Sequence, residues 1–508
     1  IRRLCSEGVR SYPGRSRLAL ERATAVSRSE KSAEAVVAAG TGRRAERVEV
    51  HEDVSMPGAM RQMPERSGRG GVASGEAARE ASSDEARGPR RDTEGTGSAL
   101  LAAALTRENL QQAWRRVKAN KGSAGVDGLD IGQTALHLKT SWPQIRERLL
   151  RGTYRPSPVR RVTIPKPGGG ERELGIPTVT DRLIQQALLQ VLQPLLDPSF
   201  SEHSYGFRPG RRAQDAVLAA QAYVQSGRRI VVDVDLEKFF DRVNHDILMA
   251  RLERRIADAA VLRLIRAYLD AGIMGDGVVQ RRYQGTPQGG PLSPLLANVL
   301  LDEVDRELER RGHCFVRYAD DCNVYVRSLK AGARVMALLR RLYAGLRLTV
   351  NEAKSAVASV FGRKFLGYSL WVASGGEIKR RVADKPMATF KQRVRQLTRR
   401  SAGRSMAEVA ERLRPYLLGW KAYFRMAQTP RLWLALDEWL RHRLRAIQLK
   451  HWKRGTTMYR ELKALGASHE DAHRVAANSR RWWRNSAGRL NRVMPIAYFD
   501  RLGVPRLS

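Results

Sequence analysis

The feature that most constrains the fold is a short apolar segment, Arg229–Asp235, which is the strongest β-strand signal in the chain and ends on a carboxylate. Two further apolar segments, Cys314–Tyr318 and Asn323–Val326, are predicted to form a pair of strands with Asp320 and Asp321 at the tip between them. If these strands are neighbours, three carboxylates meet at one edge of a sheet.

Three carboxylates placed together repel one another and raise each other's pKa unless a cation lies among them. Carboxylate oxygens that leave coordination positions open suit Mg²⁺, which commonly shares its ligands with substrate phosphates. Two such ions about 4 Å apart are the usual arrangement for nucleotidyl transfer. An Asp-Asp pair alone is more often ordinary turn chemistry, and Asp233 is interpreted as a strand-edge residue. The residues around Asp320 and Asp321 must therefore decide between a metal site and an ordinary turn.

The overall charge favours a polyanionic partner. The chain has 91 Lys and Arg against 52 Asp and Glu, a net charge of +39 and a pI of about 11.0, so nucleic acid is the first candidate. No apolar run approaches the roughly 18 residues that a membrane-spanning helix needs. The three cysteines, Cys5, Cys314 and Cys322, form no paired CxxC elements, which argues against a disulfide framework or a cysteine zinc site and favours a reducing, intracellular compartment.

The charge is distributed unevenly. Residues 1–100 carry 18 basic and 15 acidic residues with little apolar surface, so we predict a disordered N-terminal extension. Residues 379–460 carry 22 basic and 5 acidic residues in a helical pattern, in which Trp420 and Phe424 are expected to pack in the core. The arginines of this region are candidates for phosphate contact: Arg393, Arg395, Arg399, Arg400, Arg404, Arg441, Arg443 and Arg445.

Local signals place several other elements. Thr106 is predicted to cap a helix that carries Leu110, Ala113 and Val117. Residues 154–180 read as a basic hairpin, and Asp181 is predicted to cap the helix that follows.

Five ordered motifs resemble those of reverse transcriptases. Tyr318–Asp321 looks like the YxDD signature, and Asp235–Asp241 resembles the aspartate motif that precedes it. Gln284–Pro294 resembles the loop that contacts template and nucleotide, Leu348–Ser355 the later lysine motif, and Phe365–Tyr368 the primer grip.

Two more segments narrow the resemblance. Leu174–Thr178 with Asp181-Arg182, and Ser204–Pro209, resemble group II intron-encoded reverse transcriptase–maturases, and the similarity runs from about residue 106 to 508. Many relatives continue into a DNA endonuclease with paired cysteines and histidines. Because no cysteine follows Cys322, we expect the compact bacterial class C-like form without that domain.

The resemblance implies an α+β fold of the right-hand polymerase type. Residues 101–370 would form the fingers and a palm with an antiparallel sheet, and residues 371–460 an α-helical thumb and maturase domain (domain X). Residues 461–508 would be a basic tail that binds DNA or RNA, and residues 1–100 the disordered extension.

The resemblance also implies roles at the acidic centre. Asp235 and Asp320 would bind two Mg²⁺ ions, for which Mn²⁺ can substitute, with the Leu236 carbonyl assisting and Asp321 completing the cluster. Lys354 resembles the lysine proposed to protonate the leaving pyrophosphate, although an ordinary solvated lysine is an equal alternative.

Substrate contacts are implied for a further set of residues. Lys166 and Arg172 would clamp the incoming triphosphate, against the alternative of a solvated basic hairpin. Phe240 would be the bulky gate that clashes with a ribose 2′-OH and so favours deoxynucleotides. Gln288 would face the nascent base pair, while the run that includes Gly289 and Pro291 would let the backbone approach the template.

These expectations define an RNA-directed DNA polymerase with a maturase function. Its partners would be group II intron RNA, a DNA primer or target and deoxynucleoside triphosphates, with no membrane; whether it forms a homodimer is left open. A bacterial cytoplasmic location, at the nucleoid when acting on DNA, follows. Two alternatives stay open: a splicing-only maturase with a silent polymerase, disfavoured by the intact carboxylates, and a domesticated or defence-associated reverse transcriptase, disfavoured by the region after residue 379.

Overall fold

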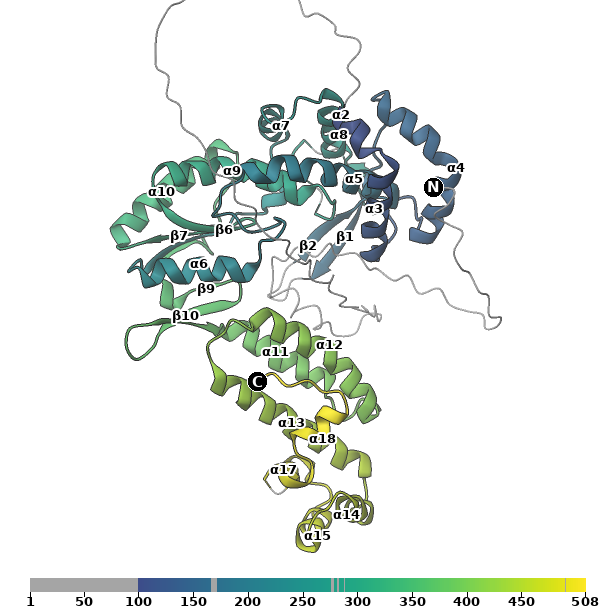
Figure 1. The fold of residues 1–508 in the computed structure, drawn as a ribbon, viewed down its shortest axis with the longest axis vertical. Helices are drawn as coiled ribbons and strands as arrows, with labels where there is room; N and C mark the ends of the chain where they lie inside the picture. Colours follow the sequence, from purple (N-terminus) through teal and green to yellow (C-terminus); the bar gives the residue numbers. More distant parts are fainter. Residues whose placement is uncertain (1–98, 166–170, 276–277, 281–282, 287, 489) are drawn as a thin grey trace, which may run out of the picture.

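A computed structural model describes residues 99–165, 171–275, 278–280, 283–286, 288–488 and 490–508, without the side chains of Arg172 and Val278. Figure 1 shows a part built from sheets and helices, followed along the chain by a separate group of helices. Residues 1–98 of the predicted N-terminal extension lie outside the described residues. The combination of sheets with a helical C-terminal region confirms the predicted α+β class.

The central sheet has the strand order β6-β7-β3-β8, and all neighbours are antiparallel. Its side chains alternate between two cores because successive residues of a strand point to opposite faces. Val232 and Val324 face a core shared with α9 and α10, whereas Val231 and Tyr325 face α6. The elements concerned are α6 (Ala213–Gln225), β3 (Ile230–Val234), α9 (Ser293–Arg310), β6 (Cys314–Tyr318), β7 (Asp321–Val326), α10 (Leu329–Gly345) and β8 (Ala356–Ser359).

A second sheet, of order β2-β1-β4-β5, confirms the predicted basic hairpin as the antiparallel pair β1 and β2. Thr106 caps α3, as predicted. The elements are α2 (Ala99–Ala104), α3 (Arg107–Ala119), α4 (Ile131–Leu150), β1 (Val159–Pro165), β2 (Glu171–Ile176), α5 (Val179–Leu196), η1 (Asp197–Ser199), η2 (Phe239–Asp241), α7 (His245–Glu253), α8 (Ala259–Asp270), β4 (Ile273–Gly275) and β5 (Val278–Gln280).

The predicted cap of α5 is wrong by three residues. Thr178 caps the helix by accepting a hydrogen bond from Asp181 N, and Asp181 lies within the first turn. The Asp181 carboxylate is buried and accepts hydrogen bonds from Tyr154 Oη (2.8 Å) and Thr178 Oγ1 (2.7 Å). Burial raises the pKa of this carboxyl. Asp181 therefore ties the helix to the segment before β1.

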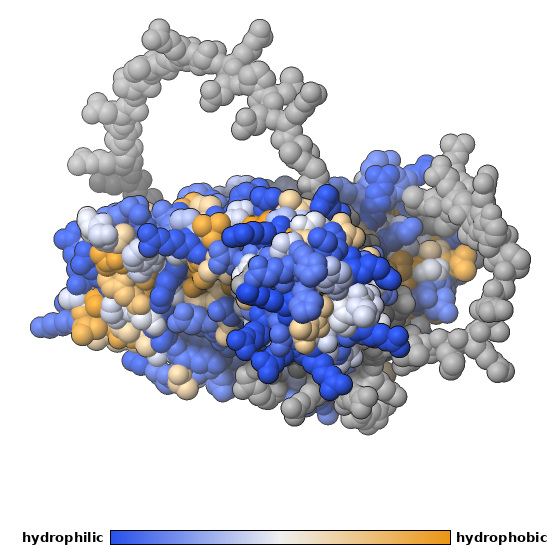
Figure 2. Space-filling view, turned by 90° about the horizontal axis from the view of Figure 1, so that it is seen from below, coloured by the Kyte–Doolittle hydropathy of each residue, from blue (hydrophilic) through white to orange (hydrophobic). Residues whose placement is uncertain are grey.

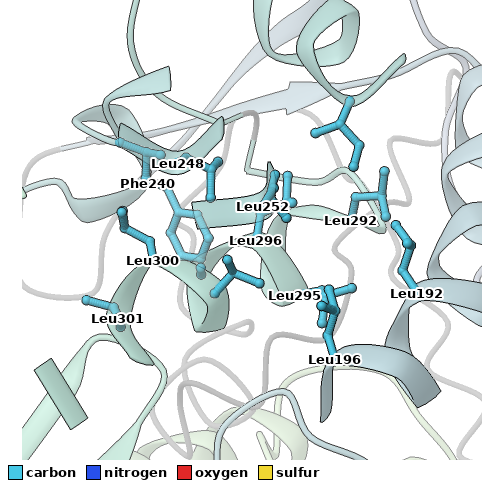
Figure 3. Close-up of a cluster of buried hydrophobic side chains, with 14 of the residues drawn as sticks. Leu192, Leu196, Phe240, Leu248, Leu252, Leu292, Leu295, Leu296, Leu300 and Leu301 are labelled. Atoms are coloured by element: carbon cyan, nitrogen blue, oxygen red, sulfur yellow. The ribbon is translucent and has the colours of Figure 1, made fainter. Parts of the chain in front are cut away.

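The largest core joins α5, α7 and α9 to the central sheet. Figure 3 shows leucines of these three helices in one cluster, with the Phe240 ring beside those of α7 and α9 and with Leu192 and Leu196 of α5 on the far side. The same cluster contains Val232 and Val234 of β3, so the strand that leads to Asp235 is anchored in the core.

The helical region follows a small sheet of order β11-β10-β9. Trp420 and Phe424 are buried in its core, as predicted, and residues after 461, among them Leu490 and Phe499, belong to the same cluster. The elements are η3 (Val360–Gly362), β9 (Lys364–Phe365), β10 (Tyr368–Val372), β11 (Ile378–Val382), α11 (Asp384–Leu397), α12 (Met406–Phe424), α13 (Pro430–Trp452), α14 (Gly455–Ala464), α15 (His469–Ala477), α16 (Trp482–Asn485), α17 (Leu490–Val493) and α18 (Ile496–Arg501).

The surface seen in Figure 2 is mainly hydrophilic, with hydrophobic residues in small scattered groups. Among the described helices, none combines the length and the apolar character needed to cross a membrane.

Candidate active site

The register of the central sheet brings the three predicted carboxylates to one edge. Strands β3 and β7 pair as far as Val234, the residue before Asp235. The β6–β7 hairpin closes with Tyr318 opposite Asp321, so that Asp320 lies in the turn between them. Neighbouring strand ends therefore carry all three residues, as the strand pattern predicted.

Lys354 reaches the same edge from a later loop. Its Nζ is 3.1 Å from Asp235 Oδ2, an ion pair in which the carboxylate is 29% exposed and the lysine 67% exposed. The loop is fastened to Asp235 by its backbone and by Ser355: Asn351 N donates to Asp235 O (2.8 Å), and Asp235 N donates to Ser355 Oγ (3.0 Å). The lysine motif and the first aspartate motif thus form one unit.

The turn that carries Asp320 is supported from within the protein by a buried arginine. Arg317 is fully buried, forms a bidentate pair with Asp305, and donates from Nη1 to Asn298 Oδ1 (3.0 Å) and to Ala319 O (2.9 Å). Ala319 has a φ of +58°, the left-handed region that few non-glycine residues adopt. Sequence reasoning missed this support, although an arginine inside the apolar segment Cys314–Tyr318 was a visible signal.

Segment Ser204–Pro209 packs against this turn. Gly206 lies so close that a Cβ on it would overlap Ala319 N, and Asn298 Nδ2 donates to Gly206 O (2.9 Å). Only glycine fits such a close approach of two backbones. The motif Ser204–Pro209 is therefore a neighbour of the turn that carries Asp320.

Asp233 is more than the strand-edge residue that the sequence suggested. Arg363 donates to Asp233 Oδ2 from Nε (3.0 Å) and Nη2 (2.5 Å), and the same Nη2 donates to the Lys354 carbonyl (2.9 Å). Burial raises the pKa of the Asp233 carboxyl, and the adjacent guanidinium opposes that shift. Arg363 thus connects β3 to the loop that presents Lys354.

Phe240 lies just beyond Asp235 and is 7% exposed. Its ring packs edge to face against Phe239 and Phe207, with centroid distances of 5.1 and 6.5 Å. Its carbonyl accepts a hydrogen bond from Thr286 N (2.7 Å), so the loop that starts at Gln284 also supports it. The predicted gate residue is held on several sides.

The loop before α9 contains three of the predicted substrate residues. Gly175 N of β2 donates to Gln288 O (3.2 Å), and Gly289 has a φ of +142° at a place where a Cβ would come within 2.6 Å of Gly175 O. Pro291 is half-buried in the same loop. These contacts join the loop to the β1–β2 hairpin. The contacts of Gln288, Gly289 and Pro291 with template and nucleotide stay predictions.

The predicted triphosphate clamp is only partly described. Lys166 lies outside the described residues. Arg172 lies on β2, opposite Ile164 in the β1 register, and its side chain is outside the described part of the chain.

The donor set at the sheet edge suits a hard divalent cation, because all three side chains offer carboxylate oxygens. Asp235 is partly exposed, whereas Asp320 is only 8% exposed. Within the described residues, no three His, Cys, Asp or Glu side chains are grouped closely enough to hold a metal ion. The chemistry of the residues therefore fits magnesium, and a bound ion would require the carboxylates to draw together.

Several of the predicted phosphate-contacting arginines form a surface cluster in the helical region. Arg395, Arg399 and Arg400 are exposed, and the Arg395 and Arg443 guanidinium groups lie 5.7 and 5.4 Å from the Trp439 ring centroid. Burial and the neighbouring arginines lower the pKa of Arg443 to about 10. The neighbouring candidates Arg393 and Arg404 are half-buried.

The structure contradicts the predicted phosphate contact of two other arginines. Arg441 is fully buried and pairs with Asp437 (2.9 Å) and Asp500 (3.4 Å). Arg445 is 6% exposed and donates to Met494 O (2.9 Å). Both side chains hold the C-terminal residues against α13 and face the interior of the domain.

Two family models match this chain. The reverse transcriptase (RNA-dependent DNA polymerase) family matches residues 164–370, and the group II intron maturase-specific domain matches residues 387–466. The first match includes the acidic sheet edge, and the second includes the arginine cluster.

Curated relatives include proteins encoded by group II introns. Protein YkfC of Escherichia coli is 32% identical over 313 residues, which cover 53% of this chain and 82% of that protein. Group II intron-encoded protein LtrA of Lactococcus lactis is 29% identical over 335 residues, 53% of this chain and 56% of LtrA. Putative COX1/OXI3 intron 1 protein of Saccharomyces cerevisiae is 31% identical over 215 residues, 41% of this chain and a quarter of the yeast protein.

Among solved structures, a chain of the partial Cas6-RT-Cas1–Cas2 complex is 27% identical with a TM-score of 0.33, covering 49% of this chain and 42% of that one. The two family matches and the relatives carry the assignment. The chain belongs to the reverse transcriptase family, in the form in which that domain is joined to the maturase-specific domain of group II introns.

Proposed function

We propose that this protein copies its group II intron RNA into DNA and also binds that RNA to assist its splicing. The observation that carries the polymerase part is the placement of Asp235, Asp320 and Asp321 at neighbouring strand ends of the central sheet, with the Lys354 ammonium 3.1 Å from Asp235. In the reaction, the primer 3′-oxygen forms a bond to the α-phosphorus of a deoxynucleotide, and pyrophosphate leaves.

Asp235, Asp320 and Asp321, with the Leu236 carbonyl, would hold two Mg²⁺ ions, which when bound supply charge stabilisation at the phosphoryl oxygens and an acidified 3′-hydroxyl. Arg317 and Gly206 fix the backbone of the turn that bears Asp320, so bound ions would draw the carboxylates together mainly through side-chain movement. This fixed placement is what the chain itself contributes.

Lys354 is proposed to donate a proton to the leaving pyrophosphate. Its ion pair with Asp235 and the fastening of its loop to the end of β3 support this role. The lysine is mostly exposed, so a triphosphate can reach it. Phe240 is proposed to select deoxynucleotides, because an aromatic ring beside the sugar leaves no room for a 2′-hydroxyl.

RNA binding is proposed for the exposed Arg395, Arg399 and Arg400 together with the half-buried Arg443, which with Arg395 lies against the Trp439 ring. Duplex RNA is recognised mainly through its shape, phosphates and 2′-hydroxyls, which suits an arginine-rich helical surface. The splicing chemistry itself belongs to the RNA, and no residue of this region is assigned a catalytic role.

The test is primer extension on an RNA template with deoxynucleotides, comparing the native chain with Asp320→Ala. We expect extension by the native protein and none above background by the variant. Asp246→Asn is the matched control, because Asp246 is 81% exposed and pairs with Arg266 on the surface. Equal extension by the native protein and by Asp320→Ala would refute the carboxylate centre.

The maturase part is tested separately with the intron RNA transcribed from the DNA around the gene. Asp320→Ala is expected to assist splicing as well as the native chain does, because splicing needs only the RNA-binding surface. A native chain that assists splicing without extending primers would instead support a splicing-only maturase. A chain with neither RNA binding nor splicing assistance, but with extension, would favour a domesticated or defence-associated enzyme.

A further inference from the structure

We infer that Phe207 determines sugar selectivity by holding the Phe240 ring in place, an inference that rests on the proposed gate role of Phe240. The two rings meet edge to face, with centroids 6.5 Å apart and an interplanar angle of 66°. Edge-to-face pairs at this distance are attractive, and they favour one relative orientation of the rings. Phe207 is therefore a positioning residue, which acts through Phe240 and need not touch the nucleotide.

The backbone of Phe207 supports this role. Its φ is +63°, and a bulky residue in the left-handed region is an outlier that persists only where its surroundings enforce it. Glycine or asparagine would adopt this conformation at lower cost. The phenylalanine side chain must therefore serve a purpose that a turn alone does not require.

Both neighbours of Phe207 are fastened. On one side, Gly206 is wedged against Ala319 and bonded to Asn298 Nδ2 (2.9 Å). On the other side, Arg208 is 7% exposed, pairs with Asp197 (3.0 Å) and donates to Ser201 O (2.5 Å). The backbone of Phe207 is consequently fixed on both sides, which limits how far its ring can shift with Phe240.

A backing ring matters because Phe240 belongs to a buried cluster made largely of leucines, which offer its ring no aromatic edge to pack against. Figure 3 shows the Phe240 ring next to leucines of α7 and α9. Without Phe207, the gate ring gains a direction in which it can turn away from a ribose 2′-hydroxyl. The loss of Phe207 should therefore admit ribonucleotides while leaving deoxynucleotide incorporation nearly intact.

The experiment measures kcat/KM for a deoxynucleotide and for the matching ribonucleotide on one primer and RNA template. Phe207→Leu is expected to lower the deoxy-over-ribo ratio roughly threefold to tenfold, the range that one aromatic pair supports. Phe207→Tyr, which keeps the ring, is expected to retain the native ratio. In a Phe240→Ala background, Phe207→Leu is expected to lower the ratio no further, because its effect passes through Phe240.

The control for loss of a buried ring is Phe390→Leu. Phe390 is fully buried in the helical region against Tyr416 and Trp420, so its loss should affect stability but not the ratio. If Phe207→Leu fails to fold, Phe207→Gly removes the same ring and also relieves the positive φ, and the same fall in the ratio is expected.

Two results would overturn the inference and are distinguishable. If Phe240→Ala lowers the ratio and Phe207→Leu and Phe207→Gly do not, Phe207 has no part in selectivity while the gate stands. If Phe240→Ala leaves the ratio unchanged, the gate itself is refuted, and the inference falls with it.

Discussion

The backbone of Gly206 packs directly against the amide of Ala319, so that a Cβ on Gly206 would overlap the Ala319 nitrogen. These residues belong to segments more than a hundred positions apart, one in the Ser204–Pro209 motif and the other in the turn that carries Asp320. Asn298 completes the contact by donating to the Gly206 carbonyl from α9. The placement of the turn that carries Asp320 therefore requires a residue without a side chain at position 206.

Gly206→Ala is expected to reduce primer extension strongly, because the added methyl group must displace the turn that bears Asp320. Overpacking of this kind also costs about 1–3 kcal/mol of unfolding free energy, measurable by chemical denaturation. Gly210→Ala is the control: Gly210 has a φ of +72° and open space around it, so the variant is strained but displaces nothing. Full activity of Gly206→Ala would contradict the dependence of the Asp320 turn on the close approach of Gly206.

Arg317→Leu is expected to destabilise the fold by about 3–5 kcal/mol, because Asp305 is left as a buried charge without its partner. The same substitution frees the Ala319 carbonyl, so extension should fall further than stability alone explains. Arg266→Leu, which breaks the exposed pair with Asp246, is expected to cost about 1 kcal/mol or less. Urea denaturation measures the unfolding free energy of both variants. Equal losses would contradict the greater importance of the buried pair.

The parts of the site that could be predicted from the sequence are those that depend on residues close together along the chain. The apolar alternation that defines β3, β6 and β7 determines which residues lie at their ends, so the order of residues alone places Asp235, Asp320 and Asp321 at strand ends. The pairing of Asp233 with Arg363 could not be predicted, because it joins residues 130 positions apart and depends on how the chain after β8 returns to the sheet.

Two arginines of α13 occupy helix positions that indicate burial, although the high arginine content of the region suggests exposure. Arg441 and Arg445 fall on the same helical stripe as the buried Leu440 and Leu444, and Asp437 lies one turn before Arg441. A charged residue on an apolar stripe with an opposite charge four positions away is expected to be buried and paired. Composition alone ranked these arginines with the exposed ones.

Arg363→Gln is expected to slow single-turnover nucleotide addition roughly tenfold, because the loop that presents Lys354 loses the link that Arg363 makes to Asp233 of β3. In a Lys354→Ala background the same substitution should change the rate little, since Arg363 acts through that lysine. Equal slowing in both backgrounds would mean that Arg363 has only a structural role. A weakened affinity for primer–template with an unchanged rate would instead place its effect at the adjacent primer grip.

Substitutions of exposed arginines in the helical region should lower RNA affinity, whereas substitutions of buried ones should lower stability. A triple variant, Arg395→Gln with Arg399→Gln and Arg400→Gln, is expected to keep native stability and to lose RNA affinity, because these side chains are on the surface. The slope of log affinity against log salt should become shallower by about 2–3, since each lost phosphate contact contributes roughly 0.7–0.9. Filter binding of intron RNA at several salt concentrations measures both quantities.

Arg441→Gln provides the opposite case. Removing its charge leaves Asp437 without its buried partner and releases contacts to the C-terminal residues, so unfolding free energy should fall by about 3–5 kcal/mol. The salt slope of the folded fraction should stay native, because a fully buried guanidinium neutralises no phosphate. A shallower slope for Arg441→Gln at native stability would show that this arginine reaches RNA after all, and that α13 opens on binding.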